Sequence, residues 1–222
     1  MQEPEQHALP LFIIDGPPWE KKHDIGFFVA FVETIKAFLL RPAKTFSVIR
    51  RVAGISDALV YTVGIQVFTF LWTFAMSGAD PGMLLPQNPA ILEMLELPEN
   101  FSQIMVLIYP FSIILLQFIA AYALHIALRW RGLQLYDFNL IFRILAYSGG
   151  TAALLLIIPI IGGMTSIMMT IYLAYVGLRT IYGIEFGSFL LTALLALLIA
   201  IGLYLLSAVS ITIIVLLFAI LI

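Results

Sequence analysis

The chain has 222 residues, of which 62% are hydrophobic and only 11% are charged. Globular proteins are typically about 45–50% apolar and about 25% charged, so the apolar excess excludes an ordinary soluble domain and indicates an integral membrane protein. A net charge of −2 without any Lys/Arg-rich run argues against nucleic-acid binding. The absence of cysteine excludes disulfides and thiol chemistry.

The first 24 residues are expected to form a polar cytoplasmic tail rather than a cleaved signal peptide, because they mix prolines with charges of both signs. Residues 25–53 are predicted to form an amphipathic interfacial segment, in which Phe and Leu recur at near-helical spacing until Pro42. This segment either lies on the cytoplasmic leaflet, with Lys36, Arg41 and Lys44 toward anionic lipid, or packs on the bundle as a cytoplasmic helix. The pattern favours neither alternative.

Residues 54–222 are predicted to form an all-α polytopic membrane bundle. A helix of about 20 mostly apolar residues crosses the roughly 30 Å hydrocarbon core. By that rule the sequence predicts five transmembrane helices, at about residues 55–76, 104–128, 141–161, 164–178 and 188–210. Gly162 and Gly163 are expected to form the turn between the third and fourth. The apolar stretch of residues 187–222 is too long for one perpendicular crossing, so six spans remain the alternative.

The positions of Lys and Arg predict the orientation of the bundle. Seven precede the first span, three flank the connection between the second and third, and Arg179 lies between the fourth and fifth, which accounts for all 11. The connection from Ser77 to Gln103 has none and carries four acidic residues. Because cytoplasmic loops are enriched in Lys and Arg, the N-terminus is expected in the cytoplasm and, with five spans, the C-terminus outside.

Ionisable groups within membrane helices suggest a functional site. Asp57, His125 and Arg143 are expected at the cytoplasmic boundary, as a polar cluster in which some members pair. A single histidine within a span, without nearby carboxylates or thiolates, does not make a metal site, and no metal or cofactor is expected. For Gln66 and Gln117, deeper in the bilayer, interhelical hydrogen bonds are the favoured interpretation, with contact to a substrate as the alternative.

The sequence lacks the common catalytic motifs: a phosphate-binding Gly-rich loop, His-Glu-x-x-His and Gly-x-Ser-x-Gly. Ser148, followed by Gly149, is a weak match to the serine motif of intramembrane proteases, because no histidine follows it in the chain. Small residues of this kind allow helices to approach closely in lipid. No enzymatic activity and no catalytic residue are therefore expected.

Four motifs lie in order along residues 17–205. They are Pro18-Trp19-Glu20 before a Phe-rich segment, Arg41-Pro42-x-x-x-Phe46, Phe142-Arg143-Ile144-Leu145-Ala146-Tyr147-Ser148 followed by Ile158-Pro159-Ile160-Ile161-Gly162, and Val176-Gly177-Leu178-Arg179 followed by Tyr182-Gly183-Ile184. Their order and spacing resemble the Yip-domain (Ypt/Rab-interacting protein) family of five-span membrane proteins, particularly its bacterial-type branch. The resemblance implies a role in membrane organisation or trafficking through binding to other membrane proteins.

Six motif residues have architectural interpretations. Trp19 is expected to anchor the tail at the membrane interface, and Pro159 to remove one backbone hydrogen bond near the outer end of the third span. Gly177 is expected to admit a neighbouring helix, and Arg179 to stop the fourth span at the cytoplasmic face. The residues given a structural role are Trp19, Tyr147, Pro159, Gly162, Gly177 and Arg179.

The sequence favours a membrane scaffold or interaction protein in a bacterial cytoplasmic (inner) membrane. The alternative is a small-solute transporter or channel, which Pro159 and the Gly pairs favour as elements of a broken helix. The lack of midplane charge and of an internal repeat argues against it. The expected partners are the lipid bilayer and a membrane protein or second copy of the chain, with Ala123/Ala127 and Ala196/Ala200 as close-packing stripes.

Overall fold

The structure, a computed structural model, describes residues 16–76, 78, 101–133 and 137–221. In these ranges the regular elements are all helices. Five helices are long and apolar enough to cross a membrane, which confirms the predicted all-α bundle with five transmembrane helices. The acid-rich connection between the first two spans lies almost entirely outside the described residues.

The observed helices agree with the predicted spans to within a few residues at most ends. They are α4 (Ser56–Met76), α6 (Phe101–Trp130), α7 (Phe138–Ala153) with the 3₁₀ turn η3 (Leu154–Ile157), α8 (Gly162–Tyr182) and α9 (Phe186–Leu221). The apolar C-terminal stretch forms the single helix α9, without the turn that a sixth span requires. The six-span alternative is therefore not supported.

The connection between α7 and α8 differs from its prediction. The third span was expected to continue past Pro159 to residue 161, but α7 and η3 end at Ile157. Ile158 is extended, with ψ of 114°, which is the conformation that a following proline favours. Pro159 therefore lies in the turn after the span rather than within the helix. Gly162 and Gly163 begin α8 instead of forming the turn.

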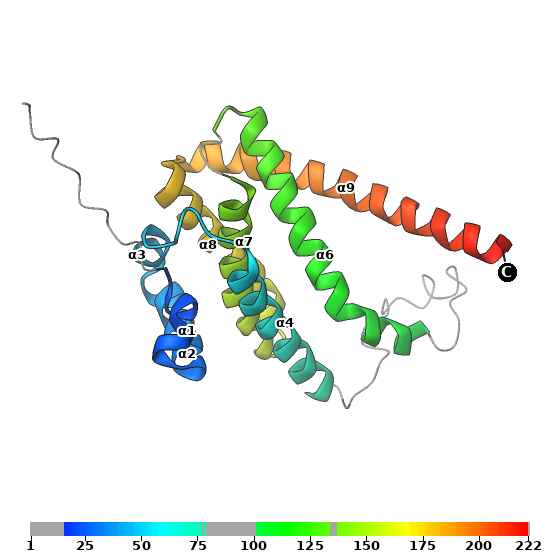
Figure 1. The fold of residues 1–222 in the computed structure, drawn as a ribbon, viewed down its shortest axis with the longest axis horizontal. Coiled ribbons are helices and arrows are strands. Elements are labelled where there is room, and N and C mark those ends of the chain that lie inside the picture. The colour runs from blue at the N-terminus through cyan, green and yellow to red at the C-terminus, as the bar shows by residue number, and fades with distance from the viewer. Residues whose placement is uncertain (1–15, 77, 79–100, 134–136, 222) are drawn as a thin grey trace, which may run out of the picture.

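Four short elements precede the bundle: η1 (Pro18–Lys21), α1 (Lys22–Ile25), α2 (Phe27–Leu40) and α3 (Pro42–Ser47). Pro18 and Pro42 each lie at the start of their helix, where a missing amide hydrogen costs nothing. We call residues 16–50 the N-terminal segment. It lies against the side of the bundle, where η1 contacts α4, α2 contacts α7 and α3 contacts α8 (Figure 1).

Of the two alternatives left open for residues 25–53, the structure shows packing on the bundle. The inner face of α2 is buried at Ala30, Thr34 and Phe38, so the helix packs on the bundle. Its other face stays apolar and exposed, with Phe28 81% and Leu40 76% accessible. This exposed face has the character expected of a surface in contact with lipid or with another apolar helix.

The spans differ greatly in how much of their surface the protein covers. α7 is the central helix, with 67% of its span buried, and it contacts α4, α6 and α8. α9 has only 11% of its span buried. It packs mainly on α6 and extends away from α7 and α8 (Figure 1). The protein core thus lies around α7, and α9 is peripheral.

Candidate functional site

The most unusual feature of the interior is a buried ion pair that joins the N-terminal segment to α7. The guanidinium of Arg143 donates from Nη2 to Glu20 Oε1, and the two side chains are only 1% and 2% exposed. Burying one charge alone costs several kcal/mol, so each member of the pair requires the other. Charge-assisted hydrogen bonds of this kind are among the strongest in proteins.

Two further side chains complete this group. The Tyr147 hydroxyl donates to Glu20 Oε1 over 2.9 Å. Arg50, which is about half exposed, places Nε 3.7 Å from Glu20 Oε2, and its carbonyl oxygen accepts from Arg143 Nη1. We call Glu20, Arg50, Arg143 and Tyr147 the Glu20–Arg143 cluster. Its hydrogen bonds engage one carboxylate oxygen and both terminal nitrogens of the buried guanidinium, and the Arg50 ion pair engages the other oxygen. Arg143 Nε is buried without a hydrogen-bond partner among the described residues.

Gly16 makes room for the carboxylate. A Cβ atom at this position would lie 2.3 Å from Glu20 Oε2, and the backbone φ of +75° is one that other residues rarely adopt. The Gly16 amide donates to the Val48 carbonyl over 3.0 Å, which joins the two ends of the N-terminal segment. The segment is therefore closed around the carboxylate of Glu20.

A second polar contact joins the segment to α4. Lys22 Nζ lies 2.5 Å from Asp57 Oδ1, and the Trp19 indole Nε1 donates to the Asp57 carbonyl over 2.7 Å. The Trp19 amide also donates to Thr34 Oγ1 over 2.7 Å. Trp19 is 1% exposed, so the prediction that it anchors a tail at the membrane interface is wrong. Its ring belongs to the protein core because its indole N–H finds a backbone acceptor there.

Aromatic rings fill the space between these two polar contacts. Tyr61 of α4 lies between Trp19 and Tyr147, with ring centroids 5.8 and 5.3 Å away. Phe38 of α2 stacks on Tyr147 at 5.1 Å. The Tyr61 hydroxyl and Thr151 Oγ1 are 2.9 Å apart. Aromatic pairs at these separations add stability beyond their buried area, so the segment is held by packing as well as by charge.

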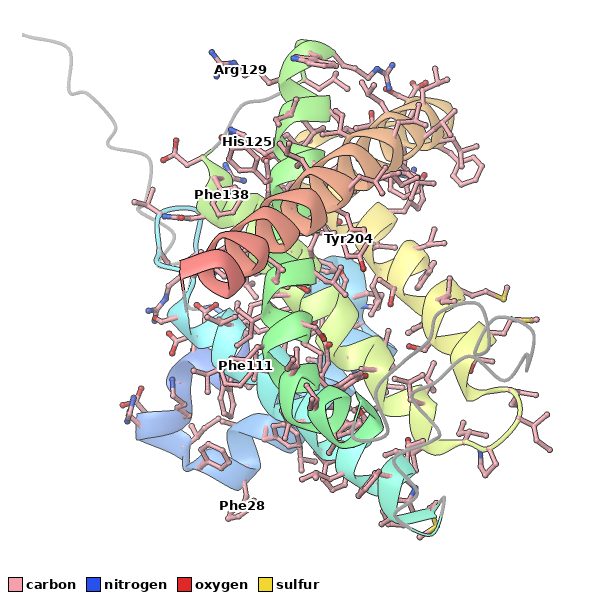
Figure 2. The ribbon with its side chains drawn as sticks, turned by 90° about the vertical axis from the view of Figure 1, so that its right-hand side faces the viewer. Phe28, Phe111, His125, Arg129, Phe138 and Tyr204 are labelled. Carbon is pink, nitrogen blue, oxygen red and sulfur yellow. The ribbon has the colours of Figure 1, made fainter. Side chains whose placement is uncertain are left out.

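The predicted cluster of Asp57, His125 and Arg143 is replaced by a different arrangement. Asp57 and Arg143 each pair with a residue of the N-terminal segment rather than with each other. His125 lies beside Phe138, with ring centroids 5.9 Å apart. Figure 2 shows these two residues near the end of the molecule that carries Arg129. The three candidates therefore do not form one site.

The two glutamines predicted deep in the bundle differ in their hydrogen bonding. Gln66 Nε2 donates to Thr62 Oγ1, one turn earlier on α4, over 3.0 Å. Gln117 Nε2 is buried and has no hydrogen-bond partner among the described residues. Ser148 is fully buried, and its hydroxyl donates to the Ile144 carbonyl of the same helix over 2.7 Å. A hydroxyl enclosed in this way has the environment of a packing residue.

Glycines bring the helices of the core together. A Cβ at Gly177 of α8 would lie 2.7 Å from Ile144 Cγ2 and 3.0 Å from Phe46 Cε1. A Cβ at Gly150 of α7 would lie 2.9 Å from the Thr62 Cα of α4. Close approach of backbones through small residues is the usual basis of helix packing in lipid. Ala123 and Ala127 of α6 are also fully buried within the chain.

Sequence reasoning identified Arg143 and Tyr147 but missed Glu20 as their partner. A signal was available, because an arginine within an apolar helix requires a buried counter-charge. The pattern could not select Glu20 from the other acidic residues of the N-terminal region, since pairing across 123 residues depends on the tertiary structure. Lys22 and Tyr61 were missed for the same reason.

The described residues contain no group of three or more His, Cys, Asp or Glu side chains that could hold a metal ion. Comparison of the chain with protein-family models, with curated proteins and with solved structures finds no match. Its function is therefore argued from the geometry described above.

Proposed function

We propose that this protein is a membrane scaffold or interaction protein that presents α2 as a binding surface for an apolar helix of another membrane protein. The observation that carries the proposal is the buried pairing of Glu20 with Arg143. This buried ion pair attaches the N-terminal segment to α7, and among the described residues its two charged side chains are almost inaccessible to a ligand.

The presented surface is the outer face of α2. This helix has 14 residues, too few to cross a bilayer. Its inner face is fixed by Phe38 and Thr34, and its outer face exposes Phe28 and Val32 one helical turn apart. An apolar helix that is already held in one orientation loses little further conformational entropy when a partner helix packs against it.

We assign the protein a cytoplasmic N-terminus and an extracytoplasmic C-terminus on the basis of its 11 Lys and Arg residues. We propose a place in a bacterial cytoplasmic membrane from the resemblance to the bacterial-type branch of the Yip-domain family. Membership of the Yip-domain family remains a proposal that rests on the motif order. Both proposals agree with a non-enzymatic role, in which the membrane and another membrane protein are the partners.

In-membrane crosslinking followed by affinity purification of the full chain tests the proposal. A double variant, Phe28→Ala with Val32→Ala, is expected to lose the main crosslinked partner. The matched control is Leu194→Ala with Leu198→Ala on α9, which removes similar exposed side chains, 56% and 60% accessible. Equal loss in both variants, or no crosslinked partner in the wild type, would contradict the proposal.

A small-solute transporter is the second candidate, because Gln117 Nε2 is a buried donor without a partner among the described residues. A solute acceptor would satisfy that donor. Solute uptake into proteoliposomes that is lost with Gln117→Leu and kept with Gln66→Leu would favour the transporter over the scaffold. Gln66 is the suitable control because its amide already donates to Thr62.

A further inference from the structure

A pocket of about 570 Å³ lies between α3 and the C-terminal turns of α8. Arg41 and Lys44 line it on the α3 side, and Arg179 lines it on the α8 side. None of the described lining residues carries a carboxylate. Three positive charges from two elements distant in sequence therefore converge on one concave surface, which favours a bound anion.

These cations are available to a ligand. Arg41 and Lys44 have exposed side chains, and neither has an ion-pair partner among the described residues. The guanidinium of Arg179 lies 6.0 Å from the ring centroid of Tyr175, and its Nη1 is 3.3 Å from the Tyr175 hydroxyl. Tyr175 thus supports Arg179 at the pocket without neutralising it.

The pocket lies at the depth of the lipid headgroups. Arg179 is in the last turn of the membrane span α8, which ends at Tyr182. Tyr172 and Tyr175 also line the pocket, and tyrosines are enriched at this level of the membrane. An anion bound here lies where phospholipid phosphates are found.

An apolar strip continues from the pocket along α8 toward the middle of the bilayer. Met168, Ile171 and Tyr172 are 64%, 51% and 50% exposed. Their spacing places them on the same face of the helix as Arg179. At 1.5 Å per residue Met168 lies about 17 Å along α8 from Arg179, close to the roughly 15 Å half-thickness of the hydrocarbon core.

We propose that this pocket binds the headgroup phosphate of one anionic phospholipid, whose acyl chain lies along the strip on α8. Arginine and lysine form charge-assisted hydrogen bonds with phosphate oxygens, and the exposed Met168 side chain adapts to a flexible chain. A zwitterionic lipid brings a cationic group that the three basic residues repel. A soluble phosphate ester has the charge but leaves the apolar strip without a partner.

Native mass spectrometry of the full chain in an uncharged detergent tests this inference. The protein is titrated with phosphatidylglycerol, with phosphatidylcholine and with glycerol phosphate as the soluble headgroup alone. We expect one phosphatidylglycerol to bind in preference to the other two. Arg179→Gln and Lys44→Gln should each weaken its binding about 5-fold, because one basic residue near a membrane surface contributes about 1 kcal/mol.

Lys36→Gln is the matched control, since Lys36 is an exposed cation on α2 outside the pocket and pairs with Glu33. It is expected to leave binding unchanged, and Arg41→Gln provides a third pocket variant. Equal binding of phosphatidylcholine, or equal weakening by Lys36→Gln and Arg179→Gln, would overturn the inference. Glycerol phosphate binding as tightly as the lipid would also overturn it, in favour of a site for free phosphate. None of these results depends on the partner proposed for α2.

Discussion

The N-terminal segment and α9 associate with the bundle in opposite ways. The segment is fixed by a buried ion pair, a second ion pair to Asp57 and stacked aromatic rings. α9 is attached chiefly near its beginning, where Arg131 Nη1 donates to the Ser188 carbonyl and lies 2.7 Å from Thr192 Oγ1. Beyond these contacts α9 presents exposed leucines and extends away from the core (Figure 1).

This difference shows how lipid changes the cost of folding. An apolar helix needs little protein contact in a bilayer, because lipid tails solvate it as well as leucine does. A segment that carries Glu20, Lys22 and Trp19 can join a membrane bundle only if its polar groups find partners there. The polar contacts are therefore concentrated at the segment whose sequence looks least like a membrane helix.

Loss of the buried arginine should have the largest effect. Arg143→Leu leaves the buried Glu20 carboxylate with only the half-exposed Arg50 as a counter-charge, and breaking a buried pair costs about 3–5 kcal/mol. We expect that loss in the free energy of unfolding, measured by SDS titration in mixed micelles. Arg129→Leu, at an exposed helix end, is the control and should stay within about 0.5 kcal/mol of wild type.

Adding one methyl group distinguishes the central helix from the peripheral one. Gly150→Ala in α7 places a Cβ 2.9 Å from the Thr62 backbone, and such overpacking costs about 1–3 kcal/mol. Gly202→Ala in α9 meets nothing within 4 Å, so it should be neutral or slightly stabilising. Equal destabilisation of the two variants in the same titration would contradict the peripheral position of α9.

The indole of Trp19 should make a smaller contribution. Trp19→Phe removes the N–H that donates to the Asp57 carbonyl over 2.7 Å, at an expected cost of about 1 kcal/mol. Tryptophan fluorescence should also lose the component best shielded from quenchers in both the aqueous and the lipid phase, since Trp19 is 1% exposed while Trp72 and Trp130 are 41% and 70% exposed. If Trp130→Phe removed that component instead, Trp19 would not be buried.

The attachment of α9 should give the smallest effect. Thr192→Val removes the hydroxyl near Arg131 Nη1, and hydrogen bonds between membrane helices contribute about 0.6 kcal/mol on average. The free energy of unfolding should fall by about that amount. A loss above about 2 kcal/mol would mean that α9 is held as firmly as the N-terminal segment.

The sequence predicted the spans because runs of apolar residues report directly on contact with lipid. It correctly placed a helical break at Pro42, since a proline at a helix start has a local cause. The end of α7 was predicted too late, because the apolar run continues through the turn at Pro159 and hydropathy does not distinguish a turn from a helix.

The polar site was harder to predict. Arg143 and Asp57 were recognised as unusual, but their partners lie 123 and 35 residues away. A charge in an apolar helix indicates that a partner exists without indicating which one. The N-terminal residues through Asp24 were predicted to be a polar cytoplasmic tail, because polar composition does not reveal that Trp19 and Glu20 are buried together.

The central claim, that Glu20 and Arg143 fix the N-terminal segment as a pair, is tested most directly by a double-mutant cycle. The free energy of unfolding is measured for wild type, Glu20→Gln, Arg143→Met and the double variant. A coupled pair predicts that the double variant loses about 1–3 kcal/mol less than the sum of the two single losses. Additive losses would show that the two side chains contribute independently, and would contradict the account.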